Sequence, residues 1–69
     1  MFLSKKLKEC RETAGLKRND LIFELYSSAG LKLSPGTWSN WESGRSVPDA
    51  NALWAIASFF KKPLEYFFK

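Results

Sequence analysis

The sequence predicts a compact all-α domain of five helices, and three observations lead to this prediction. Apolar residues recur three and four positions apart along most of the chain, which is the spacing of one face of an α-helix. Glycine, proline and small polar residues stand where these stretches begin and end, as they do at helix caps. No segment alternates apolar and polar residues for long enough to indicate a strand. With 69 residues and no linker or repeat, the chain is expected to form one domain over residues 1–69.

The composition argues against several classes of function. The chain has no histidine and one cysteine, so it lacks the commonest metal ligand and general base and has no internal disulfide. We therefore expect no catalytic residue, no metal site, no cofactor and no enzyme activity. No small-molecule ligand is indicated. The 11 Lys and Arg residues against 7 Asp and Glu give a net charge of +4, which favours an anionic partner.

The sequence contains no sign of membrane targeting. No run of about 20 apolar residues is present, as a membrane span requires. The first residues lack the apolar segment of a signal peptide. The sequence therefore predicts a cytoplasmic protein that does not contact a membrane.

The first helix is expected over residues 1–14, followed by Gly15 as a C-terminal cap. Cys10 is expected to be a small buried hydrophobe, because no second ligand or base is spaced to activate it. The apolar stripe of this first helix consists of Leu3, Leu7, Cys10 and Ala14.

The second helix is expected to begin near Lys17 and to extend to about Ser28. Asp20 falls in its first turn, where a negative charge favours the helix dipole. A loose turn through Gly30 is expected to follow. The predicted inner face consists of Leu21, Ile22, Leu25 and Tyr26.

The third helix has both ends marked in the sequence. Ser34 is a favourable N-cap, Pro35 falls at the first helical position, and Gly44 marks the C-terminal end. Trp38 and Trp41 share one face and are expected to anchor this short helix to the core. The opposite face is small and polar and includes Gly36, Ser39, Asn40 and Ser43. An anchored helix with such a face has the shape needed to enter a DNA major groove.

A fourth helix is expected from an Asp49 cap to about Phe60, with a core stripe of Leu53, Ile56, Ala57 and Phe60. A last short helical turn is expected over residues 64–68. Consecutive helical residues lie about 100° apart, so Tyr66, Phe67 and Phe68 do not all face one core. With Phe67 directed inward, Tyr66, Phe68 or both are expected to remain exposed.

These residues resemble the phage-repressor-type helix-turn-helix domains, the lambda repressor and Cro-like (XRE-type) family. The strongest part of the resemblance is residues 37–45 followed by Pro48, which is similar to the family's recognition helix and the loop after it. Residues 11–16 and 53–67 are similar to the end of the family's first helix and to its last two helices. The resemblance implies a helix-turn-helix formed by the second and third helices, and it implies DNA binding.

The resemblance also assigns roles to individual residues. Two of the family's base-reading positions are occupied by Pro35 and Gly36, so base readout is expected from Thr37, Ser39 and above all Asn40, with Gly36 allowing close approach of the backbone. An ion pair between Arg11 and Glu42 is expected to join the first and third helices. The expected phosphate contacts are Lys17, Arg18, Ser34, Ser43, Arg45 and Ser46.

The predicted function is that of a sequence-specific transcriptional regulator, a phage or prophage-type repressor. Members of the family commonly pair through the C-terminal end of this fold, so a homodimer on a palindromic operator is expected, with Tyr66 and Phe68 at its surface. The alternative is a protein-interaction module of the same fold, such as an antitoxin or an adaptor. The outer face of the third helix carries no arginine, and this observation keeps the alternative open.

Overall fold

The helices begin and end where local signals in the sequence place them. The computed structural model describes residues 1–69 and contains α1 (Ser4–Thr13), α2 (Arg18–Ala29), α3 (Pro35–Ser43) and α4 (Ala50–Phe60), followed by one 3-10 turn, η1 (Leu64–Phe67). The chain is all-helical and has no strand, as the sequence predicts. The expected fifth helix is a single 3-10 turn, so the molecule has four α-helices instead of five.

The N-terminal caps of α3 and α4 are confirmed. The Ser34 hydroxyl accepts a hydrogen bond from the Thr37 N–H at 3.2 Å, and the Asp49 carboxylate accepts one from the Ala52 N–H at 2.8 Å. Gly44 ends α3 in the left-handed region with φ of 83°. These caps satisfy backbone groups that a helix end leaves unpaired, so the nine residues of α3 have defined ends.

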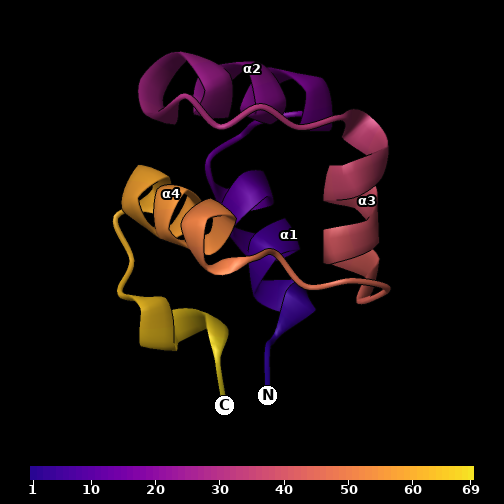
Figure 1. Cartoon of the computed structure of the whole chain (residues 1–69), viewed down its shortest axis with the longest axis vertical. Helices are drawn as coiled ribbons and strands as arrows, with labels where there is room; N and C mark the ends of the chain where they lie inside the picture. The colour runs from indigo at the N-terminus through magenta and orange to yellow at the C-terminus, as the bar shows by residue number, and fades with distance from the viewer.

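One core holds the helices together. In Figure 1, α1 lies between α3 and α4, and α2 crosses above them. α1 contacts α3 and η1, and α2 contacts α3 and α4. The rings of Trp38 and Trp41 meet edge to face with centroids 6.0 Å apart. The buried residues of the core are Leu7, Cys10, Leu21, Leu25, Trp38, Trp41, Ala52, Leu53, Ile56, Ala57 and Phe67.

The first three residues do not belong to α1, contrary to the prediction of a helix from residue 1. They run antiparallel to the last three residues, and Phe2 forms a β-bridge with Phe68. The Leu3 N–H donates to the Phe67 carbonyl at 2.7 Å, and the Lys69 N–H donates to the Met1 carbonyl at 2.9 Å. The two ends of the chain therefore lie side by side (Figure 1). In this short ribbon the two chain ends pair backbone N–H and carbonyl groups of residues 1–3, which were expected to be hydrogen-bonded within the first helix.

The inner face of α2 is narrower than the sequence predicts. Leu21 and Leu25 are buried, but Tyr26 is 56% exposed because it lies a further 100° around the helix. α2 ends at Ala29, one residue beyond the expected end, and Gly30 caps it in the left-handed region. The segment after Gly30 returns along α2 to the start of α3 (Figure 1). Leu33 in this segment lies with Ile22 in the wall of a shallow groove.

Candidate nucleic-acid interface

The two faces of α3 lie as the sequence predicts. Trp38 and Trp41 are buried in the core. On the other side, Asn40 is exposed and Thr37 is partly buried. The remaining small residues of the predicted reading face are Gly36 and Ser43, which are exposed, and Ser39, which is partly buried. The outer surface of α3 is therefore small and uncharged.

Hydrogen bonding within the helix distinguishes Asn40 from its neighbours. The hydroxyls of Ser34 and Thr37 lie 3.0 Å apart and are joined in the N-terminal cap. The Ser43 hydroxyl donates to the Asn40 carbonyl at 3.2 Å. The side-chain amide of Asn40 makes no hydrogen bond within the chain. Among the expected base readers, Asn40 thus presents an amide donor and acceptor to solvent.

Basic groups flank this face at two places. Arg45 follows α3, where its N–H and that of Ser46 donate to the Asn40 carbonyl at 2.9 and 3.3 Å. These two bonds fold the start of the loop against the end of α3, and the Arg45 side chain is exposed and unpaired. Lys17 and Arg18 stand at the start of α2, where Lys17 is exposed and Arg18 reaches toward α3.

The predicted ion pair between Arg11 and Glu42 is confirmed. The Arg11 Nε lies 2.7 Å from one carboxylate oxygen of Glu42, and its Nη2 lies 3.4 Å from the other. Arg11 also donates to the Leu16 carbonyl at 3.0 Å, so its guanidinium also binds the segment that follows α1. The Glu42 side chain is 4% exposed, which makes this a buried link between α1 and α3.

Two further partners of Glu42 were not predicted. The Trp38 indole N–H donates to Glu42 from one turn earlier on α3, and Arg18 lies 3.6 Å from the carboxylate. The Trp38 contact had a signal in the sequence, because residues four apart on a helix are neighbours. The Arg18 contact depends on how α2 packs on α3 and has no local signal. Arg18, which was expected to bind phosphate, pairs with Glu42. Its side chain is 51% exposed, so part of it also faces solvent.

The surroundings of Glu42 favour its charged form. Burial alone would raise the pKa of this carboxyl, but hydrogen bonds from Arg11 and Trp38 and the charges of Arg11 and Arg18 outweigh burial. The pKa of Glu42 is therefore lower than usual. At neutral pH the carboxylate holds three helices by charge and hydrogen bonding.

The expected dimer surface lies beside the paired chain ends. Phe68 is 43% exposed, and its ring meets that of Phe2 edge to face at 5.7 Å. Tyr66 is partly buried, with the ammonium groups of Lys6 and Lys62 each 4.8 Å from its ring centroid. Phe68 is therefore more accessible to a partner than Tyr66, whereas Phe2 is partly buried like Tyr66.

The structure also bears on metal binding and on membrane insertion. No group of three or more His, Cys, Asp or Glu side chains is placed to hold a metal ion. None of the helices combines the length and the apolar character needed to cross a bilayer.

Comparison of the chain with protein-family models, with curated proteins and with solved structures found no match. A functional assignment therefore depends on the side chains and on the arrangement of the helices that present them.

Proposed function

We propose that this chain is a sequence-specific DNA-binding transcriptional regulator of the phage or prophage repressor type, acting in the cytoplasm. In this proposal α2 and α3 form the helix-turn-helix, and α3 enters the major groove. The observation that carries the proposal is the surface of α3. Two buried tryptophans anchor a helix whose exposed face is small, with a free amide at Asn40 and an unpaired cation at Arg45 just beyond its end.

Each part of this surface has a role in the proposal. Asn40 reads a base edge, because an amide can pair with adenine through two hydrogen bonds. Thr37, Ser39 and the backbone at Gly36 make secondary contacts with bases. The cationic and hydroxyl groups around α3 hold the DNA backbone; they are Lys17, Arg18, Ser34, Ser43, Arg45 and Ser46.

A two-fold dimer completes the proposal. Phe68 and its neighbour Tyr66 would pair with the same surface of a second copy and set two copies of α3 about 34 Å apart, one turn of DNA. Such a dimer reads a palindromic operator, because its symmetry matches that of the DNA.

Selection of bound sequences from random DNA, followed by binding measurements at several salt concentrations, tests the proposal. Asn40→Ala is expected to relax the preference at one base pair of each half-site by about 1–3 kcal/mol. Arg45→Ala is the matched control, and it is expected to weaken all sequences alike and to lower the salt slope by roughly one unit. Binding to random DNA with no selected motif would contradict sequence-specific function.

A second candidate is a protein-interaction module of the same fold, such as an antitoxin or an adaptor. The observation in its favour is a set of exposed aromatic side chains away from the end of the chain. Phe23 on α2 is 65% exposed, and Trp54 on α4 is 66% exposed. Exposed aromatic rings are common in protein interfaces. Absence of binding to any DNA at low salt would favour this candidate over the first.

A further inference from the structure

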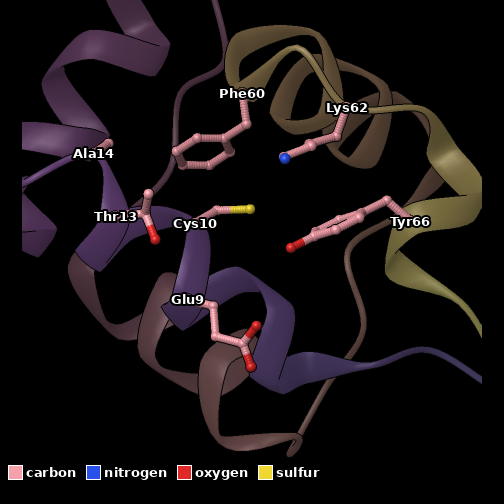
Figure 2. Close-up of a pocket in the computed structure, with 7 residues that line it drawn as sticks. All are labelled: Glu9, Cys10, Thr13, Ala14, Phe60, Lys62 and Tyr66. Carbon is pink, nitrogen blue, oxygen red and sulfur yellow. The ribbon is translucent and has the colours of Figure 1, made fainter.

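A cavity of about 300 Å³ opens between α1, the end of α4 and η1 (Figure 2). None of the residues that line this cavity belongs to α3. A volume of this size stands at the lower end of the range for small-molecule sites. Its lining residues are Glu9, Cys10, Thr13, Ala14, Phe60, Lys62 and Tyr66.

Polar groups from three elements converge on this cavity. Figure 2 shows the Cys10 sulfur, the Lys62 ammonium and the Tyr66 hydroxyl directed toward the same space. The Lys62 ammonium has no carboxylate within ion-pair distance. Glu9, the acidic residue of the lining, lies 3.7 Å from Lys6 instead. The lining carries one cation and one carboxylate, and the cation, Lys62, lies without an ion-pair partner beside the Tyr66 hydroxyl.

The backbone and an aromatic ring together place Lys62. α4 ends at Lys61 in the left-handed region with φ of 57°, and the Lys62 N–H bonds back to the Ala57 carbonyl at 2.9 Å. Lys61 is the only residue other than glycine with positive φ in the chain. The turn brings the Lys62 ammonium to 4.8 Å from the centroid of Tyr66, a favourable distance for a cation over a ring.

We propose that this cavity binds a small organic anion with a flat apolar body, an aromatic carboxylate. The carboxylate accepts hydrogen bonds from Lys62 and from the Tyr66 hydroxyl. The ring of the ligand packs against Phe60 and Ala14, two apolar residues of the lining. This proposal does not depend on contacts between α3 and DNA, although the cavity shares Tyr66 with the proposed dimer surface.

Alkylation of Cys10 measures whether the cavity is occupied, because Cys10 is the only cysteine and lines the cavity. Burial raises the pKa of this thiol, so the reaction with neutral iodoacetamide is best followed at mildly alkaline pH. Benzoate is the probe, with chloride keeping the ionic strength constant. We expect a saturable slowing of alkylation, about fivefold or more at benzoate concentrations well above a dissociation constant on the order of 1 mM.

Matched controls separate this site from general effects. Benzamide has the same ring without the charge and is expected to protect Cys10 much less. Lys62→Gln is expected to abolish protection by benzoate, whereas Lys61→Gln, one residue away, retains it.

Amide shifts in NMR spectra provide a second readout. Benzoate is expected to move the amides of residues 9–14 and 62–66 and to leave those of α3 unchanged. Unchanged alkylation with benzoate, equal protection by benzamide, or protection that persists in Lys62→Gln would each overturn the proposal. Shifts spread over all basic surfaces would overturn it as well.

Discussion

A single carboxylate joins three of the four helices. Glu42 on α3 receives Arg11 from α1, Arg18 from α2 and the indole N–H of Trp38 from its own helix. Because its side chain is almost fully buried, the charge depends on these partners in place of water. A substitution of Glu42 is therefore expected to lower the free energy of unfolding.

Glu42→Gln is expected to lower the free energy of unfolding by about 3 kcal/mol, because it leaves the buried Arg11 guanidinium without a counter-charge. Urea unfolding at neutral pH measures the loss. Arg18→Ala removes a half-exposed partner and serves as the control, with an expected loss of less than about 1 kcal/mol. Equal losses in the two variants would contradict the assignment of Arg11 as the main partner.

The pH dependence of stability follows from the lowered pKa of Glu42. The contribution of this carboxylate is fully present above its unfolded pKa and is lost as the pH falls through its lower folded pKa. The wild-type chain is therefore expected to lose stability in this acid range more steeply than Glu42→Gln. Urea midpoints measured at a series of pH values from neutral into the acid range check the expectation.

Among the elements, α4 ends differently from the others. Gly30 and Gly44 follow α2 and α3 in the left-handed region, where glycine has no steric penalty. α4 ends at Lys61, and a side chain in this conformation costs about 1–2 kcal/mol. The end of α4 is thus a strained position within an otherwise favourable helix.

Lys61→Gly is expected to stabilise the chain by about 0.5–1 kcal/mol, because relief of the strain exceeds the extra entropy of glycine in the unfolded chain. For a domain of this size, that corresponds to a rise in melting temperature of about 2–8 °C. Gly44→Ala is the reciprocal control and is expected to destabilise. Its new Cβ would be strained at φ of 83° and would lie 3.3 Å from the Ser4 hydroxyl. A lower melting temperature for Lys61→Gly would refute the strain at α4.

Elements with local signals were the most predictable from the sequence. Both ends of α3 follow from Ser34 and Gly44, since a cap involves residues only a few positions apart. The pairing of Arg11 with Glu42 was predicted by resemblance and is present. The exposure of Tyr26 was not predicted, because it depends on which part of α2 the other helices cover.

Long-range features had no signal in any single segment. The ribbon between the chain ends joins residues more than sixty positions apart, so helical periodicity near residue 1 was misleading. The cavity beside Cys10 is built by three elements and appears only after they pack. The contact of Arg18 with Glu42 likewise depends on the packing of α2 against α3.

At the scale of the whole molecule, the proposed dimer through Phe68 and Tyr66 makes a prediction about stoichiometry. Phe68→Ser is expected to weaken dimer formation on an operator, because it removes an exposed apolar ring from the proposed two-fold contact. Sedimentation of the protein–DNA complex measures the stoichiometry. Phe23→Ser, which removes an exposed ring on α2, is the control and should leave two copies bound. One copy per operator in the wild-type complex would exclude this dimer.

The two ends of the chain are hydrogen-bonded to each other, so the backbone is nearly circular. The Met1 amino group already lies 3.1 Å from the Lys69 carbonyl oxygen, so a linker of a few residues would join head to tail without moving a helix. Cyclisation would restrict the unfolded chain and, by the entropy of a closed loop of this length, would stabilise the fold by up to about 4 kcal/mol. Thermal unfolding of the circular chain beside a linear chain carrying the same linker measures that gain. The circular chain can then be cut in the loop after Gly44. This cut separates Arg45 from the end of α3 and leaves the ribbon between residues 1–3 and 67–69 intact.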